Sequence, residues 1–325
     1  MSRPLDDVAL REIFKSVDAA TLQACRRVSK SWNSEIQRLA KYTSKFRHTS
    51  LIMEIHGTEF RMMLGTPGRR ESFTHPLTSS DSIRRALRHV HPPRILLVFL
   101  NLETNAEAFA RMMDGIESKW SQGIEELEIF SRNNEVPVSE VLAHLEKFPG
   151  LLSFSITYDV TDEKISCSEI FRRLSSLRFL RINGSEENTD TSSGLVFDND
   201  AVECLLKNQN DFRNIQTIEL FNTNVSVSAE MMTKAFQKLA ALKVNPSMQS
   251  AKNCDESSEV HLLFHRCQWD SVRETSLLSL IRTMSPDVTL PILPNDEDDV
   301  LMGDFRFSVA QTDFVLKFIA GKTFF

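Results

Sequence analysis

Glycine and tyrosine are scarce in this chain, which has ten glycines and two tyrosines among 325 residues. So few glycines argue against a glycine-rich phosphate-binding loop and against a collagen-like segment. The longest clear apolar run, ILLVFL, is much shorter than the ~20 residues of a membrane-spanning helix. The stretch MSRPLDDVALREIF is charged throughout and has no signal-peptide core. We therefore expect an intracellular protein, cytoplasmic or nuclear, with no membrane partner.

Sequence motifs of the common enzyme classes are also missing. The chain has no G-x-G-x-x-G, G-x-x-x-x-G-K-[ST], G-x-S-x-G or H-E-x-x-H. His261, His265 and Cys267 form H-x-x-x-H-x-C, but zinc normally needs further ligands, and the alternating apolar neighbours favour a partly buried strand. The acidic run PNDEDD lacks the spacing of a calcium-binding loop. These absences predict a non-catalytic protein with no cofactor and no metal site.

Cysteine usage and charge narrow the class of partner. The five cysteines are widely spaced, and their odd number favours a reduced chain over a disulfide framework. The net charge of −6 gives the whole protein no attraction to nucleic acid. The charge is uneven, because residues 1–50 carry ten Lys or Arg against five Asp or Glu. We expect no nucleic-acid partner.

Residues 5–40 have the apolar spacing of three short helices, with Asp18 as the expected N-cap of the second. Three helices of this size cannot enclose much core by themselves, so a module this small usually hides its apolar stripe against a partner. The predicted partner-binding stripe consists of Leu5, Leu10, Ile13, Phe14, Val17, Leu22, Cys25, Val28 and Trp32.

The same stretch resembles an F-box. The matching positions are Leu5, Ile13, Phe14, Val17, Asp18, Leu22, Val28 and Trp32, and the spacing from Asp18 through Val28 to Trp32 agrees with the family without a gap. It departs from the family at Pro4, which precedes the first leucine instead of following it, and at Ser29, where many members have Cys. The resemblance implies that the stripe docks a Skp1-like protein of a cullin-RING ubiquitin ligase. A generic amphipathic helical hairpin is the alternative for these residues.

A repeat begins near residue 94. The pattern apolar-x-x-apolar-x-apolar occurs five times, with middle positions at Val98, Leu127, Phe154, Leu180 and Ile218. Helical patterns separate these runs, and one strand with one helix in 26–29 residues is the period of a leucine-rich solenoid. The longest interval contains a polar insertion at 184–194. Hairpins are predicted at both ends of the repeats, at 51–64 and at 305–319.

These patterns predict an α+β to α/β fold of two parts. Residues 1–45 would form the small three-helix module, and residues 50–325 an irregular leucine-rich-repeat-like β-α solenoid with flanking hairpins. An F-box followed by degenerate repeats resembles the nematode F-box proteins with an FTH-type domain. That resemblance implies a substrate-receptor subunit, which captures a target protein and reaches a cullin through the Skp1-like protein. A ligase-independent interaction scaffold and an enzyme are the alternatives.

Side-chain alternation along the predicted strands assigns a candidate target-binding face. Four phenylalanine rings lie among charged residues on this face, as in a protein-binding hot spot with polar surroundings. The alternative is that loops or terminal strands of the same chain cover it, since large exposed apolar patches are uncommon on monomers. The candidate residues are Phe99, Glu126, Glu128, Phe130, Phe179, Arg181, Glu219 and Phe221.

Overall fold

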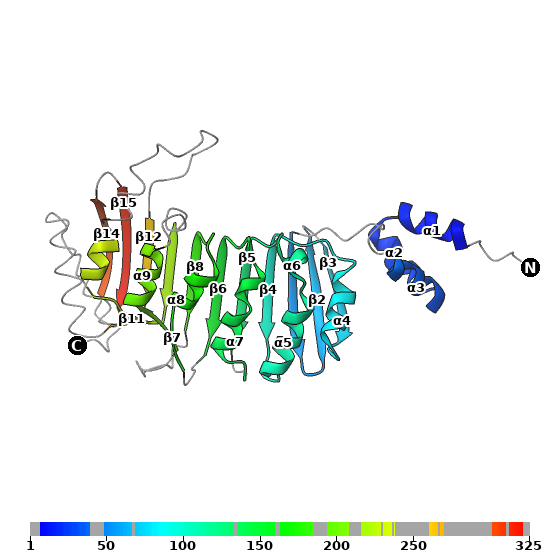
Figure 1. The fold of residues 1–325 in the computed structure, drawn as a ribbon, viewed down its shortest axis with the longest axis horizontal. Coiled ribbons are helices and arrows are strands. Elements are labelled where there is room, and N and C mark those ends of the chain that lie inside the picture. Colours follow the sequence, from blue (N-terminus) through cyan, green and yellow to red (C-terminus); the bar gives the residue numbers. More distant parts are fainter. Residues whose placement is uncertain are drawn as a thin grey trace, which may run out of the picture.

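The computed structural model describes most of the chain between residues 7 and 320. The described residues are 7–39, 49–66, 69–132, 135–159, 163–184, 194–207, 216–228, 230–235, 237, 260–265, 267–269, 301–309 and 312–320. They form a mixed α/β structure in which an eleven-stranded, mostly parallel sheet is the largest element (Figure 1). The predicted fold class is confirmed at this level.

Three helices come first in the chain: α1 (Asp7–Ser16), α2 (Ala19–Cys25) and α3 (Lys30–Arg38). Side-chain caps fix where two of them begin. A carboxylate oxygen of Asp18 accepts from the Thr21 N–H at 2.8 Å, and the Ser29 hydroxyl accepts from the Trp32 N–H at 3.1 Å. Each cap satisfies an amide that lacks a partner inside its helix.

An antiparallel unit opens the sheet. Strands β1 (Ser50–His56) and β2 (Glu59–Thr66) form the hairpin predicted around HGTE, and Gly57 takes the positive φ of 52° at its turn. Strand β3 (Arg69–Pro76) extends the hairpin, and helix α4 (Ser80–Leu87) follows; the sequence predicted neither. Strand β1 then pairs in parallel with the first repeat strand, so the hairpin continues the same sheet.

The repeat strands form a parallel array in chain order. They are β4 (Ile95–Leu100), β5 (Glu126–Ser131), β6 (Ser153–Tyr158), β8 (Phe179–Asn183) and β10 (Thr217–Phe221), and β12 (Val260–His265), outside the predicted repeats, pairs in parallel with β10. The register corrects the first repeat, because Leu127 pairs with Leu96 and not with Val98. The first interval, from Leu96 to Leu127, is therefore 31 residues long. A shift of two residues keeps side chains on the same face, so the predicted facing is unaffected.

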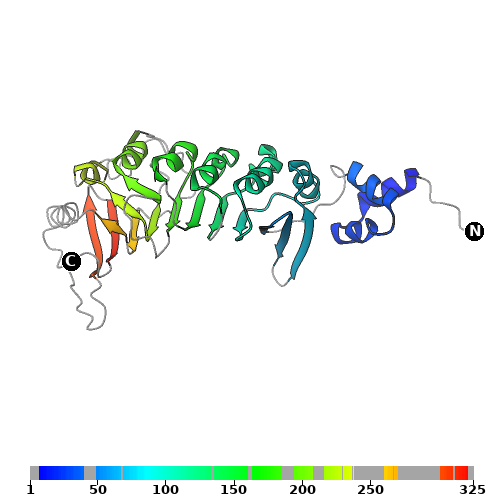
Figure 2. The same cartoon turned by 90° about the horizontal axis from the view of Figure 1, so that it is seen from below.

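Helices cover one face of this array, in a row that Figure 2 shows along one side of the strands. They are α5 (Ala106–Gly115), α6 (Ser118–Ser121), α7 (Val138–Ala143), the 3-10 helix η1 (Leu145–Lys147), α8 (Ser168–Arg173), α9 (Asn199–Lys207) and a short helical stretch at 230–235. Phe109, Leu142 and Phe171 project from them and are buried with Phe154 and Leu180 of the strands. This layer of helix and strand side chains is the main hydrophobic core.

A second sheet of four short strands is absent from the sequence prediction. Its order is β13 (Gln268–Trp269), β11 (Asn224–Ser226), β9 (Gly194–Asp198) and β7 (Lys164–Ser166). The buried hydroxyl of Tyr158, at the end of β6, accepts from the Leu195 N–H in β9 at 2.9 Å. This hydrogen bond joins the two sheets. Most of the predicted insertion at 184–194 lies outside the described residues.

The far end of the large sheet is a second antiparallel pair. Strand β15 (Thr312–Ala320) is parallel to β12, and β14 (Leu301–Val309) pairs with β15 at the edge. The predicted hairpin at 305–319 is thus present. The acidic run PNDEDD, at 294–299, lies outside the described residues.

Candidate functional site

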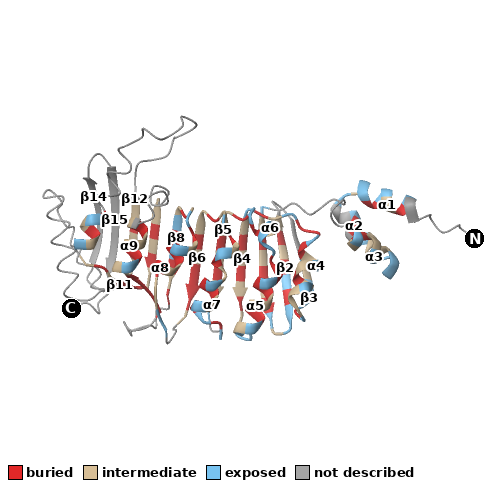
Figure 3. Ribbon diagram, viewed as in Figure 1, coloured by how far each residue is buried: buried red, intermediate tan, exposed pale blue. Residues whose placement is uncertain are grey.

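One face of the large sheet has no described helix on it (Figure 2). Along β4 and β5 the burial alternates residue by residue (Figure 3). Val98 and Ile129 are therefore buried on the helix side, while Phe99 and Glu128 face the other way. All eight side chains of the candidate face are exposed or only partly buried. The alternation thus places them on the side of the sheet away from the helices.

Parallel register arranges this face in rows across the strands. Glu126, Ser153, Phe179 and Thr217 form one row, and Glu128, Ser155, Arg181 and Glu219 form the next. In a third row the rings of Phe99 and Phe130 are stacked, with centroids 4.4 Å apart and planes at 5°. Phe221, in the same row on β10, lies 5.3 Å from the His265 ring. The first row thus carries a carboxylate and an aromatic ring, the second carries charged and hydroxyl groups, and the third holds the other three candidate phenylalanines.

The first two rows surround a hollow of about 240 Å³. It forms because the short side chains Ser153 and Ser155 on β6 lie between longer ones on β5 and β8. Phe99, Phe130 and Phe221 do not line the hollow. The other five candidate residues line it: Glu126, Glu128, Phe179, Arg181 and Glu219.

The hollow is lined by more negative than positive side chains. Arg181 Nε lies 2.5 Å from a Glu219 carboxylate oxygen, which makes a close ion pair. The Ser155 hydroxyl donates to Glu128 Oε1 across 3.4 Å. Glu126 has the Arg94 guanidinium 3.6 Å away, but Arg94 makes its closer contact, at 2.7 Å, with Glu125. Three carboxylates against one guanidinium leave the lining negative, and its negative side is strand β5.

The three-helix region contains a small core of its own. Leu10, Phe14, Leu22, Ile36 and Leu39 are buried together, with Val17, Cys25 and Trp32 partly buried against them. The Trp32 ring meets the Phe14 ring edge-on, at a centroid distance of 5.4 Å and an interplanar angle of 70°.

This core changes which residues of the predicted stripe are free to contact a partner. Leu10, Phe14 and Leu22 belong to the stripe, yet they face the other helices, because three helices enclose more apolar surface than their size suggested. Ile13 and Val28 instead present 41% and 62% of their surface to solvent. The two are the exposed large apolar side chains among residues 9–39, while Leu5 lies outside the described residues.

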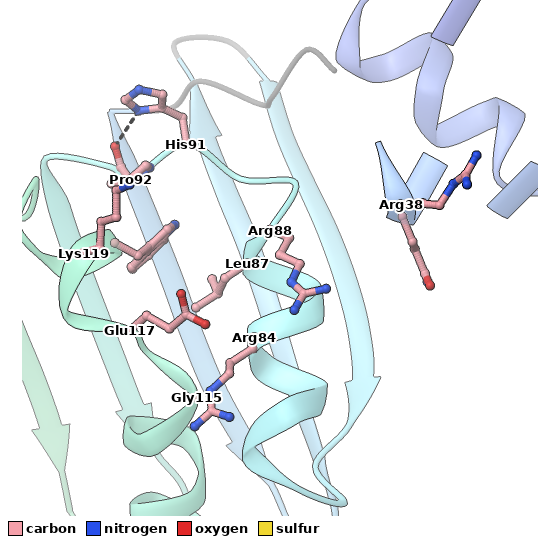
Figure 4. A pocket seen from close by; sticks show the side chains of 11 residues that line it. Arg38, Arg84, Leu87, Arg88, His91, Pro92, Gly115, Glu117 and Lys119 are labelled. Atoms are coloured by element: carbon pink, nitrogen blue, oxygen red, sulfur yellow. Dashed lines mark hydrogen bonds between the residues drawn. The ribbon is translucent and has the colours of Figure 1, made fainter. Parts of the chain in front are cut away.

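A larger pocket of about 520 Å³ lies beside α4 and α6 (Figure 4). Arg84, Arg88 and Lys119 give it a basic lining, and Glu117 contributes one carboxylate. Arg84 already pairs with Asp81 at 2.7 Å. The sequence patterns missed this pocket, because α4 was not predicted and its arginines had no recognised place in the fold.

The H-x-x-x-H-x-C sequence does not converge. His265 lies beside Phe221, whereas the buried Cys267 thiol donates to the Leu220 carbonyl oxygen at 3.2 Å. Burial raises the pKa of Cys267 to about 12, which favours the protonated thiol over the thiolate that binds zinc. Across the described ranges there is no group of three His, Cys, Asp or Glu placed to hold a metal. None of the helices in those ranges is long and apolar enough to cross a membrane.

Phe179 offers a test of whether this sheet face is surface or core. Phe179→Ser is expected to change the free energy of unfolding by less than about 1 kcal/mol, because its ring is 43% exposed. Phe154→Ser, one strand away on the helix-covered face, should cost at least about 3 kcal/mol, since its ring is fully buried. Thermal melting of both variants measures the difference. A large fall in the melting temperature of the Phe179 variant would mean that another layer covers this face.

Comparison with known families assigns the N-terminal segment. Residues 4–44 match the F-box domain. No curated protein matches the chain significantly.

Proposed function

We propose that this F-box-containing chain is the substrate-receptor subunit of a Skp1–cullin–F-box ubiquitin ligase. F-box domains generally bind Skp1-like proteins, and the match at residues 4–44 is the observation that carries the proposal. In this role the chain has no catalytic site of its own and acts inside the cell, where the ligase works. The remainder of the chain, a leucine-rich-repeat-like solenoid resembling the FTH type, binds the target protein.

Exposed apolar residues on the helical module support the docking half of this proposal. Ile13 and Val28 give a partner direct apolar contacts, and truncating such contacts is costly when the partner covers them fully. Phe14 and Leu22 act indirectly, because their burial holds the three helices together. Trp32 lies between these roles, partly buried on Phe14.

The sheet face supports the target-binding half. It is broad, carries aromatic and charged side chains in ordered rows, and includes a hollow. A rigid parallel sheet positions such side chains with little entropy left to lose on binding. A surface of this kind suits an extended segment of a protein.

Co-purification with a Skp1-like protein and a cullin tests the role. We expect the full chain to form a ternary complex with both, and the double variant Ile13→Asp/Val28→Asp to lose it. The matched control is Leu102→Asp, since Leu102 is an apolar residue 71% exposed outside the module. A complex with the Skp1-like protein that excludes the cullin would instead indicate a ligase-independent scaffold. Binding to neither protein would overturn the proposal.

A further inference from the structure

The hollow on the sheet face has the size of a single side chain. Its volume of about 240 Å³ lies below the ~300–1,000 Å³ of pockets that hold whole small molecules. Its floor consists of Ser153 and Ser155 on β6, which leave a trough between β5 and β8. A long, thin side chain from a bound protein fits this shape better than a bulky ring or a nucleotide.

Charge decides which long side chain the hollow would accept. Glu219 already neutralises Arg181 at 2.5 Å, so the guanidinium of Arg181 has little attraction left for an acidic ligand. Glu126 and Glu128 point from the same face of β5, about 7 Å apart along the strand. Their described partners are Arg94 at 3.6 Å and the Ser155 hydroxyl at 3.4 Å, both weak contacts. Two carboxylates held this way favour a cation.

An aromatic wall faces these carboxylates. Phe179 lies in the same row as Glu126, with Ser153 between them, so their backbones are two strand spacings or about 10 Å apart. Its ring is 43% exposed. A cation placed over Ser153 would have a carboxylate on one side and an aromatic ring on the other, and both attract it.

Arginine fits this arrangement better than lysine. The guanidinium is planar, carries five N–H donors and stacks on aromatic rings, so it can bridge two carboxylates while its plane lies against Phe179. An ammonium group is a compact, strongly hydrated point charge and would lose more on leaving water.

We propose that this hollow binds one arginine side chain from an extended segment of the target protein. Glu126 and Glu128 would accept hydrogen bonds from the guanidinium, Phe179 would stack on it, and Ser153 and Ser155 would leave room for it. The inference rests on the proposed function, because it names the chemistry by which the substrate receptor recognises its target. The stacked Phe99 and Phe130 rings, in the neighbouring row, give an apolar surface to residues beside that arginine.

Selection from a library of random linear peptides on the immobilised full chain tests the proposal. We expect arginine to be enriched at one peptide position. The selected peptide is then compared with versions in which this arginine is replaced by lysine or by citrulline, which keeps the shape and removes the charge. Citrulline should weaken binding about tenfold or more, with lysine in between. Because the peptide is what changes, this result is independent of how any protein variant folds.

The protein side of the interaction is tested with Glu126→Gln/Glu128→Gln. This variant should bind the arginine peptide about tenfold more weakly and show little further loss with citrulline, since both changes remove the same contact. The matched control is Glu107→Gln on α5, whose side chain is exposed on the helix-covered side. A library that yields no binder, enrichment of acidic peptides, or equal affinities for arginine and citrulline would each overturn the inference.

The Skp1-like protein and cullin are assayed with the same protein preparation. If both bind but arginine shows no advantage, the inference fails and the ligase role stands. If the arginine peptide binds while both ligase subunits do not, the hollow is a recognition site and the proposed ligase role fails.

Discussion

Replacing Phe14 with alanine is expected to unfold the helical module and abolish binding to a Skp1-like protein. Phe14 is fully buried and packs edge-on against Trp32 at the centre of a core of five buried residues. A buried Phe→Ala change costs about 3–5 kcal/mol. That loss rivals the whole stability of a module with so small a core. Hydrogen exchange should show lost amide protection in residues 7–39, with protection kept in the large sheet.

Comparing Phe14→Ala with Val28→Asp distinguishes loss of the module's fold from loss of contact with the partner. Val28 is 62% exposed, so this variant should keep the amide protection of residues 7–39. It should nevertheless lose the Skp1-like partner, because it places a carboxylate in the apolar surface that we propose contacts that partner. If Phe14→Ala retained full protection, the five buried residues would not act as a cooperative core.

Replacing Tyr158 with alanine should cost about 3–5 kcal/mol, in the range of other large aromatic truncations in packed cores. The Tyr158 side chain is buried between the two sheets, and its hydroxyl accepts from the Leu195 N–H at 2.9 Å. Tyr158→Phe keeps the ring and leaves that N–H without its acceptor, at a cost of about 1–3 kcal/mol. Chemical denaturation of both variants measures the two free energies of unfolding.

The Tyr158→Phe variant should also lose amide protection in one particular place. Hydrogen exchange in the Tyr158→Phe variant should accelerate first in β9, where Leu195 loses its acceptor. A Tyr158→Phe variant as stable as the unaltered chain, with unchanged exchange in β9, would show that the hydroxyl does not tie the sheets together.

Much of the large sheet could be predicted, because its strands carry strong apolar alternation. The repeat strands from β5 to β10 follow that pattern, and so do the β1–β2 and β14–β15 hairpins. The first repeat was displaced by two residues, since Ile95 to Leu100 is apolar throughout and offers no unique register. Only pairing with β5 fixes which leucine lies opposite Leu127.

The missed elements gave weak sequence signals. Strands β7, β11 and β13 have two or three residues each, too few to show a period. Helix α4 buries only Ile83 and Leu87, and β3 reads RRESFTHP with no regular alternation. Neighbouring elements, rather than their own patterns, determine these structures.

The candidate site, like the fold, could be predicted only in part. Alternation was enough to predict which side chains share the outer face of the sheet. The hollow depends on which residues become neighbours across three strands, and Ser153 forms a floor only because Glu126 and Phe179 flank it in register. In the helical module, spacing identified the apolar stripe but not that Phe14 and Leu22 face inward, since this depends on how the three helices pack.

The antiparallel strands at the two ends of the large sheet also bear on self-association. A stack of parallel strands with open edges could add further copies end to end and grow into filaments. Among the described strands, the outermost are β3 and β14, and each pairs with a described strand on one side only. Strand β3 ends in Pro76, and a proline disfavours pairing with another strand. We therefore expect the edge at β3 to resist the addition of a strand from another copy of the chain.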